Sequence, residues 1–186
     1  ENNSSRNEFF DPDEHKMVKR VSCSNTVSYK PDNKKIDISI LGLDCGVKHS
    51  MIRSFIEQGI EFTRVPFDLD PFEEDLDFDA IFVSNGPGDP TWNKETITTI
   101  EKAFDRHVPV MGICLGNQLM ALAAGAETYK LKYGHRSQNQ PVRDLDSGNC
   151  YITSQNHGFS VVESSLPAEW KVWFKNINDG TVEGIK

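Results

Sequence analysis

The chain has 186 residues, which is enough for one compact domain and a short additional segment. Hydrophobic residues make up 37% of it, so a sizeable core can be buried. The net charge of −8 argues against nucleic acid as a main partner, because phosphate binding needs a basic face. The chain has no apolar run of the roughly 18 residues that a transmembrane helix needs, so we expect no membrane partner. Its polar N-terminus does not have the pattern of a secretory signal.

Residues 1–35 are rich in Asn, Ser, Asp and Lys, and we interpret them as a linker. Within this linker, the apolar alternation from Met17 to Ser22 could add a strand. From residue 36 the pattern changes to that of a folded domain, which we assign to residues 36–186. Buried strands are predicted at 36–43, 61–67, 79–84 and 109–113, and amphipathic helices at 48–58, 95–105 and 115–124.

This order of elements predicts an α/β fold, an open and mostly parallel sheet with helices on both faces. Shorter strands are predicted after residue 126, at 128–132, 150–154, 159–162, 171–175 and 181–185. The acidic stretch from Asp68 to Asp79 contains Pro71 and is interpreted as a solvated loop. We therefore expect no metal site from it.

The strongest chemical signal is the segment Gly112-Ile113-Cys114-Leu115-Gly116-Asn117-Gln118. It has the form of a nucleophile elbow, in which small residues on both sides let a strained strand-to-helix turn close. A thiol at a helix N-terminus meets unpaired N–H groups, which favour the thiolate and lower the thiol pKa. The N–H of Leu115 points to where an oxyanion would form. The alternative is a buried structural cysteine between two incidental glycines.

The segments Ser84-Asn85-Gly86-Pro87-Gly88-Asp89-Pro90 and Ser154-Gln155-Asn156-His157-Gly158-Phe159 are weaker signals. The first follows a predicted strand, as the Cys114 segment does, and its glycines let backbone approach a ligand, although an ordinary Gly-Pro turn explains it too. The second suits a substrate-binding loop or a hairpin turn. His157 could act as a base for Cys114. His107 lies at the far end of the strand that leads to Cys114. His15 lies in the linker, and we expect His49 and His135 to be solvated.

The four cysteines are Cys23, Cys45, Cys114 and Cys150, and no two of them form a CxxC pair. A structural zinc site would need more closely spaced ligands, and a disulfide framework is unusual in a chain of this size. We interpret them as free thiols in a reducing compartment, the cytoplasm.

The three polar segments, in this order, resemble those of class I glutamine amidotransferases, whose fold is flavodoxin-like. The segment 154–159, together with Gly134-His135-Arg136 and Asp44-Cys45-Gly46-Val47-Lys48, is similar to the glutaminase domain of carbamoyl-phosphate synthetases of the small-subunit type. Residues 11–22 resemble the connector from that subunit's N-terminal domain, which is absent from this sequence. The resemblance covers nearly the whole chain.

The resemblance implies that Cys114 attacks the side-chain amide of L-glutamine and that a thioester forms. It also implies that ammonia passes to a carbamoyl-phosphate synthetase domain or large subunit, for the pyrimidine or the arginine pathway. The glutamine pocket would be lined by Gly86, Gly88, Leu115, Gln118, Asn156, Gly158 and Phe159. No cofactor is expected in this domain, and ATP and magnesium are expected in the partner synthetase, which could lie on the same polypeptide.

The resemblance is incomplete in one respect, because the family's catalytic His and Glu lie in a His-Pro-Glu motif that residues 1–186 do not contain. We expect this chain to stop before that motif and to have weak activity or none. Two other functions remain open: a catalytically silent amidotransferase-like regulatory or interaction module, and an amidotransferase subunit that serves another synthase.

Overall fold

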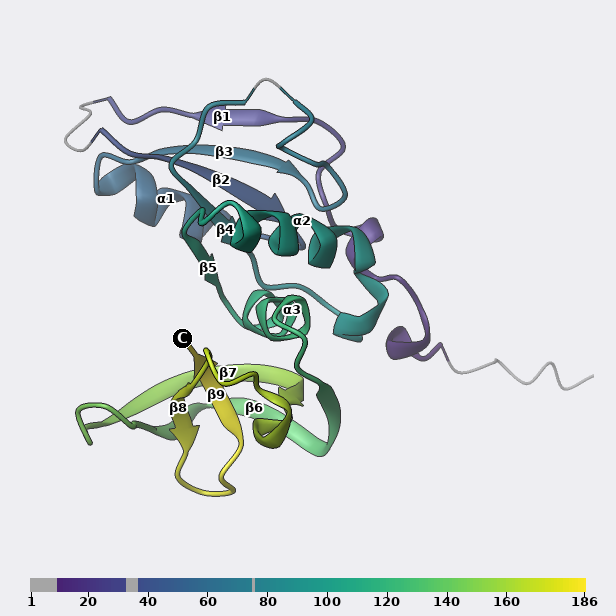
Figure 1. Cartoon of the computed structure of the whole chain (residues 1–186), viewed down its shortest axis with the longest axis vertical. Coiled ribbons are helices and arrows are strands. Elements are labelled where there is room, and N and C mark those ends of the chain that lie inside the picture. The colour runs from purple at the N-terminus through teal and green to yellow at the C-terminus, as the bar shows by residue number, and fades with distance from the viewer. Residues whose placement is uncertain (1–9, 33–36, 75) are drawn as a thin grey trace, which may run out of the picture.

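A five-stranded sheet organises the first two thirds of the computed structural model, which describes residues 10–32, 37–74 and 76–186 (Figure 1). Its strand order is β1-β3-β2-β4-β5. The strands are β1 (Val27–Tyr29), β2 (Ser39–Asp44), β3 (Glu61–Pro66), β4 (Ala80–Val83) and β5 (Val110–Gly112). Neighbouring strands from β3 to β5 run parallel, whereas β1 pairs with β3 in the antiparallel direction. The sheet is therefore mostly parallel, as the sequence predicts.

Helices cover both faces of this sheet. On one face, Ile52 of α1 (His49–Glu57) packs with the fully buried Phe62 and Phe82 of β3 and β4. On the other face, α2 (Lys94–Asp105) and α3 (Leu115–Ala123) pack against the alternate strand residues, such as Leu41 and Val83. All three helices begin and end within one residue of the predicted bounds, so the predicted α/β fold is confirmed.

A second sheet is formed by the last third of the chain (Figure 1). Its strands are β6 (Thr128–Asp144), β7 (Cys150–Val161), β8 (Val172–Asn176) and β9 (Val182–Ile185), and they close into a barrel in the order β6-β7-β9-β8. All of these pairings are antiparallel. We call these four strands the closed sheet.

The closed sheet departs from the prediction in two places. β6 has 17 residues, whereas the sequence predicts a strand of five at 128–132. The segment 154–159, expected to be a loop or a hairpin turn, lies within β7, where Asn156 pairs with Arg136. A continuous partner strand supplies backbone hydrogen bonds along this polar segment, so pairing outweighs its turn-forming composition.

α3 connects the two sheets. Six of its nine residues are buried, and one apolar cluster contains Leu115 and Leu119 of α3 together with Val161 of β7 and Val182 of β9. A helix that is buried on most of its surface is typical of a central element between two layers. Because Cys114 directly precedes α3, packing of both sheets fixes the position of this residue.

The N-terminal segment is packed against the domain over its described part. The strand expected between Met17 and Ser22 is wrong, since this stretch contains a 3-10 helix, Val18–Arg20, in which Val18 is fully buried. Further 3-10 helices occur at Pro12–Glu14, Pro90–Trp92 and Glu163–Ser165. The start of the first predicted strand, residue 36, lies outside the described residues. The assignment of residues 1–35 as a connector to another domain stays a prediction.

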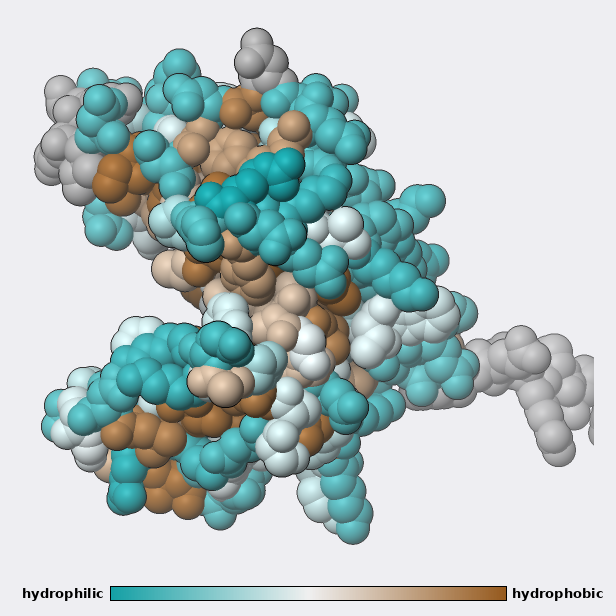
Figure 2. All heavy atoms as spheres, in the orientation of Figure 1, coloured by the Kyte–Doolittle hydropathy of each residue, from teal (hydrophilic) through white to brown (hydrophobic). Residues whose placement is uncertain are grey.

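Within the described ranges, every helix is too short or too polar to cross a bilayer. In Figure 2 the surface is hollowed between the two sheets, and apolar residues gather on the closed sheet. The large exposed apolar side chains on its strands and turns include Tyr151, Ile152, Trp173 and Ile177.

Candidate active site

Cys114 lies at the turn between β5 and α3, in a backbone conformation that side chains rarely adopt. Its φ is 55° and its ψ is −108°. Only one other described non-glycine residue, His107, has a positive φ. Backbone strain of this kind costs roughly 1–3 kcal/mol and persists only where the surroundings impose it. The strained elbow that the sequence predicts at Cys114 is therefore present.

The two glycines that flank Cys114 are required by close backbone contacts. A Cβ atom on Gly116 would lie 2.1 Å from the carbonyl oxygen of Val83, and one on Gly112 would lie 2.4 Å from the carbonyl carbon of Gly116. Carbon and oxygen atoms cannot approach so closely, so a larger residue at either position would push α3 away from β4 and β5. The G-x-C-x-G pattern is thus explained by sterics at both glycines.

The loop after β4 meets the loop after β2 at the same edge of the sheet. The Cys45 N–H donates to Ser84 Oγ at 2.9 Å, and Asn85 Nδ2 donates to the Gly46 carbonyl at 3.1 Å. A Cβ on Gly86 would lie 2.2 Å from the Cys45 carbonyl oxygen, so this position needs glycine. Gly88 has a φ of +85°, which also favours glycine.

A cavity of about 880 Å³ lies between these loops and the closed sheet. It contains Cys114 and six of the seven predicted pocket residues, namely Gly86, Gly88, Gln118, Asn156, Gly158 and Phe159. The seventh, Leu115, is 1% exposed and does not line the cavity with its side chain. The geometry therefore brings segments 84–90, 112–118 and 154–159 together, although the role of each residue stays a prediction.

Gln118 and Asn156 connect the Cys114 turn and α3 to β7. Gln118 Nε2 donates to the Phe159 carbonyl at 2.8 Å, so this side chain ties α3 to β7. The Cys114 thiol donates to the Asn156 carbonyl oxygen at 3.9 Å. The side chain of Asn156 is exposed and remains free to reach a ligand in the cavity.

The environment of Cys114 raises the pKa of its thiol, contrary to the expected lowering. Burial is the largest cause, and the negative charge of Glu183 raises the pKa further. A hydrogen bond from the Leu115 N–H lowers it, which is the predicted effect of the helix N-terminus, but this effect is the weaker one. The thiol is thus mostly protonated near neutral pH unless a base or a bound ligand changes its surroundings.

The other three cysteines are unsuited to the same role. Cys45 is completely buried, which raises its pKa to about 12. Cys23 is half-buried with a raised pKa, caused first by burial and then by Asp44, while Cys150 is exposed at the start of β7. All four thiols are free, as the sequence analysis predicts.

His157 is the histidine shared by three cavities that Cys114 lines. Its Nδ1 lies 2.9 Å from the Phe159 carbonyl oxygen, and its Nε2 lies 3.1 Å from Glu183 Oε2. Burial alone would lower the pKa of His157, but the Glu183 carboxylate outweighs burial and the pKa is raised. An imidazole with a carboxylate partner therefore lines the same cavities as the Cys114 thiol.

Sequence reasoning missed two members of this neighbourhood. His135 was expected to be solvated, yet it is 8% exposed in β6 and contacts Gln155, Asp179 and Glu183. Glu183 was not singled out, because a lone carboxylate in the short apolar stretch of β9 has no motif around it. His49 is exposed as predicted, and His15 and His107 are exposed too.

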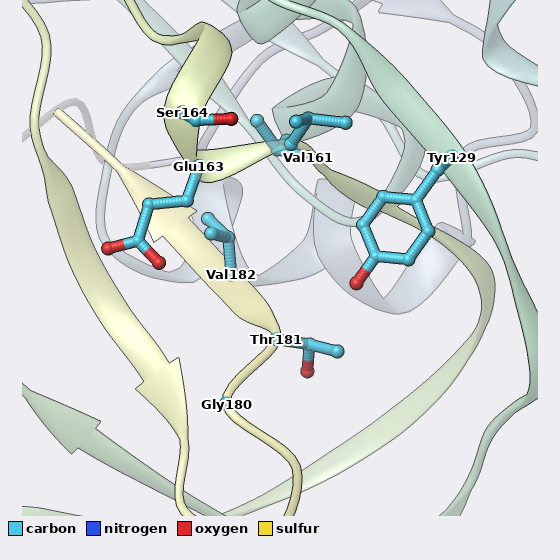
Figure 3. A pocket seen from close by; sticks show the side chains of 8 residues that line it. Tyr129, Val161, Glu163, Ser164, Gly180, Thr181 and Val182 are labelled. Atoms are coloured by element: carbon cyan, nitrogen blue, oxygen red, sulfur yellow. The ribbon is translucent and has the colours of Figure 1, made fainter.

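A further cavity of about 550 Å³ lies on the closed sheet (Figure 3). Tyr129, Glu163 and Thr181 surround it, together with Val161 and Val182. It contains none of the predicted site residues and no cysteine or histidine. The chemistry-bearing residues thus gather at the Cys114 cavity and not at this one.

A family model described as glutamine amidotransferase class-I matches residues 41–186, which is most of the chain. The chain belongs to the class-I glutamine amidotransferase family. The match includes the Cys114 elbow, the loop after β4 and the whole closed sheet, so the amidotransferase family accounts for both halves of the site.

Two curated relatives illustrate which class-I amidotransferases this chain is similar to. The carbamoyl phosphate synthase small chain of Pyrococcus furiosus is 50% identical over 172 residues, which cover 91% of this chain and 46% of the relative. The carbamoyl phosphate synthase arginine-specific small chain of Neurospora crassa is 45% identical over 178 residues, which cover 95% of this chain and 39% of the relative. The chain therefore spans less than half the length of these relatives.

Solved amidotransferase structures share the fold. A putative GMP synthase subunit from Thermoplasma acidophilum superposes with a TM-score of 0.68 at 25% identity, covering 80% of this chain and 77% of that one. A glutamine amidotransferase from Thermotoga maritima gives a TM-score of 0.63 at 19% identity, covering 81% of this chain and 74% of that one. The second likeness concerns the fold alone.

Proposed function

We propose that Cys114 hydrolyses the side-chain amide of L-glutamine to glutamate and ammonia, in the cytoplasm, as the glutaminase part of a carbamoyl-phosphate synthetase. The observation that carries this proposal is the strained elbow at Cys114, which faces a cavity formed by the glycine loop after β4 and by β7. Membership of the class-I amidotransferase family and the names of the relatives support it.

The reaction begins when the Cys114 thiolate attacks the amide carbon of the glutamine side chain. The tetrahedral oxyanion is stabilised by the N–H of Leu115 and by a backbone N–H near Gly86. The C–N bond then breaks as the nitrogen takes up a proton, so ammonia leaves and a γ-glutamyl thioester remains. Water adds to the thioester carbon, the C–S bond breaks, and glutamate is released with the thiolate restored.

The charge of the cavity suits an amino acid with a free carboxylate. The protein carries a net charge of −8, yet this cavity is lined by four cationic side chains, Lys48, Lys130, Lys132 and Arg136, and by one carboxylate, Asp13. Asp13 pairs with Lys130 at 2.7 Å, so the one carboxylate of the lining neutralises only one of the four cations. We infer that this local excess of positive charge attracts the α-carboxylate of glutamine.

The departing nitrogen needs a proton donor, and general acid–base catalysis contributes roughly 10²- to 10⁴-fold to such reactions. The resemblance assigns this role to a His-Pro-Glu motif that residues 1–186 do not contain. We therefore expect these residues alone to release glutamate slowly. Any remaining rate would depend on His157, whose Nε2 lies 3.1 Å from the Glu183 carboxylate.

The ammonia is proposed to pass to a synthetase domain or large subunit that holds ATP and magnesium. The relatives named as carbamoyl phosphate synthase small chains support this partner over the synthase of another pathway. The Neurospora relative's arginine-specific name supports an arginine-pathway role, and pyrimidine synthesis is the alternative.

A glutamine analogue that carries a diazoketone tests the nucleophile. We expect it to modify Cys114, with the site identified by peptide mass spectrometry, and we expect glutamine to protect against modification. Cys114→Ser should abolish labelling, whereas the exposed Cys150→Ser should leave it unchanged. Labelling that survives Cys114→Ser would refute the assignment, and an unlabelled Cys114 in a folded protein would argue for the silent regulatory module.

A further inference from the structure

Three potential metal ligands converge inside the closed sheet, next to the Cys114 cavity. His135 of β6 lies directly opposite His157 of β7 in the strand pairing, and Glu183 comes from β9. One ring nitrogen of His135, one of His157 and a carboxylate oxygen of Glu183 all lie within 4.8 Å of one another. The three side chains are only about a tenth exposed, at 10%, 11% and 9%.

The outer hydrogen bonds of the two rings decide which nitrogen atoms face the centre. His157 Nδ1 lies 2.9 Å from the Phe159 carbonyl oxygen, which can only accept, so Nδ1 carries the proton. His135 Nε2 lies 2.8 Å from Asp179 Oδ2, and an ionised carboxylate also only accepts. In the neutral rings, the lone pairs of His135 Nδ1 and His157 Nε2 therefore point inward.

The centre that these lone pairs face is rich in electron donors. Glu183 Oε1 is 3.1 Å from His135 Nδ1, and Glu183 Oε2 is 3.1 Å from His157 Nε2. Gln155 Oε1 is 2.7 Å from His135 Nδ1 and 3.3 Å from His157 Nε2. Acceptors this close to one another repel unless a cation lies between them, so the arrangement calls for a metal ion or for added protons.

The spacing and the outer partners match those of a zinc site. Zinc binds His nitrogen and carboxylate oxygen at about 2.0–2.2 Å, so ligand atoms in a tetrahedral site lie roughly 3.3 Å apart. Each histidine nitrogen lies 3.1 Å from a different oxygen of Glu183, which is close to this spacing. Ligating histidines usually donate their other N–H to a carboxylate or a carbonyl, which is what Asp179 and Phe159 accept here.

We propose that His135, His157 and Glu183 bind one divalent metal ion of the zinc type. The ligands come from three strands that meet only through tertiary folding, so the ion fastens β6, β7 and β9 together behind the Cys114 cavity. The proposal holds whether or not the protein hydrolyses glutamine, because it depends on these ligands and not on the thiol. The alternative occupant is one or more protons, which would give an ion-pair network without metal.

Zinc titration of the purified protein tests this site after treatment with a chelator and removal of that chelator. We expect one zinc ion per chain by isothermal titration calorimetry and a zinc-dependent rise in the unfolding temperature. Glu183→Gln and His135→Gln should each weaken binding at least 10-fold, since loss of outer-sphere partners alone costs 10- to 100-fold. The matched control is His49→Gln, an exposed histidine in α1, which should bind as the unsubstituted protein does.

Two further measurements keep the test decisive if a ligand variant folds poorly. Asp179→Asn retains all three ligands and should weaken zinc binding roughly 10-fold or more with native circular dichroism. Cobalt(II) in place of zinc should give visible d–d bands without a sulfur-to-cobalt charge-transfer band. Absence of saturable binding, equal affinity of Glu183→Gln and His49→Gln, or a charge-transfer band lost in Cys114→Ser would each overturn the proposal.

Discussion

The parallel sheet and the closed sheet hold their parts of the site by different means. Between α1 and the parallel sheet, three aromatic rings pack against one another: the half-buried Phe55 of α1 stacks on the buried Phe62, and both meet the buried Phe82 edge-on. The closed sheet buries polar groups, among them His135, Ser160 and Asn176. Cys114 is therefore positioned by apolar packing and tight backbone contacts, whereas the groups around it are positioned by hydrogen bonds. Substitutions in the two sheets should differ accordingly.

The largest effect is expected from Phe62→Ala, which removes a fully buried ring from the α1 face of the parallel sheet. We expect a loss of roughly 3–5 kcal/mol in the free energy of unfolding, from lost burial and the cavity that remains. Urea denaturation followed by circular dichroism measures it. Ile152→Ala in the closed sheet, where the side chain is 70% exposed, should change stability by less than about 0.5 kcal/mol. Similar losses of stability in both variants would contradict the proposed difference between the two sheets.

Gly116→Ala tests whether backbone contact fixes the elbow. Its added methyl would lie 2.1 Å from the Val83 carbonyl oxygen, so we expect destabilisation of about 3 kcal/mol and slower alkylation of Cys114. The control is Gly158→Ala in β7, where the nearest atom outside the adjacent residues is 3.8 Å away, and its stability should stay within about 0.5 kcal/mol. A stable Gly116→Ala protein would mean that α3 can move freely from β4.

Asn176→Ala probes the polar interior of the closed sheet. Asn176 is 2% exposed, its Nδ2 donates to Gln140 Oε1 at 3.2 Å, and its Oδ1 accepts from the Asn178 N–H at 2.9 Å. Removing this amide breaks both hydrogen bonds, and we expect the free energy of unfolding to fall by roughly 1–3 kcal/mol. Asn178→Ala, at an exposed position on the same turn, should be nearly neutral by the same denaturation experiment. Equal effects would show that the network contributes little.

The smallest expected effect is a shift in the pH dependence of Cys114 alkylation. It depends on both sheets, because Glu183 of the closed sheet raises the pKa of Cys114. A raised pKa means less thiolate at a given pH, so alkylation of Cys114 by iodoacetamide should increase up to a pH above the usual thiol range. Glu183→Gln removes one negative charge, and its rate profile should move to lower pH. Both proteins are alkylated over a range of pH with a metal chelator present, the reaction is quenched at set times, and the Cys114 adduct is measured by mass spectrometry. An unchanged profile would show that burial alone raises the pKa.

Sequence patterns predicted the parallel sheet well because each of its elements satisfies its own periodicity. The predicted helix at 115–124 and the observed α3 differ by one residue, and the loops at Gly86 and Cys114 meet at one edge as expected for parallel strands. The steric need for Gly112 and Gly116 was also visible in the sequence. What the sequence did not indicate was the net pKa direction at Cys114, since burial depends on distant segments.

The closed sheet was predicted poorly because its strands are specified by partners far apart in sequence. The segment from Gln155 to Gly158 has the composition of a turn, but pairing with β6 extends it as a strand. His135 lies in a polar stretch, and only the barrel closure buries it against Asp179 and Glu183. No local pattern can identify such a cluster, because its members acquire partners only after the strands assemble.

The unusual backbone of Cys114 also bears on the stage of folding at which this conformation can arise. The φ of 55° is maintained by the contact of Gly116 with Val83 and by the burial of α3 between two sheets. A chain in which β4, β5 and α3 have not yet assembled has an ordinary cysteine at this position, free to relax to a negative φ. The strained conformation of Cys114 therefore depends on the assembly of β4, β5 and α3, and misfolded copies of the protein would carry this thiol on a relaxed backbone.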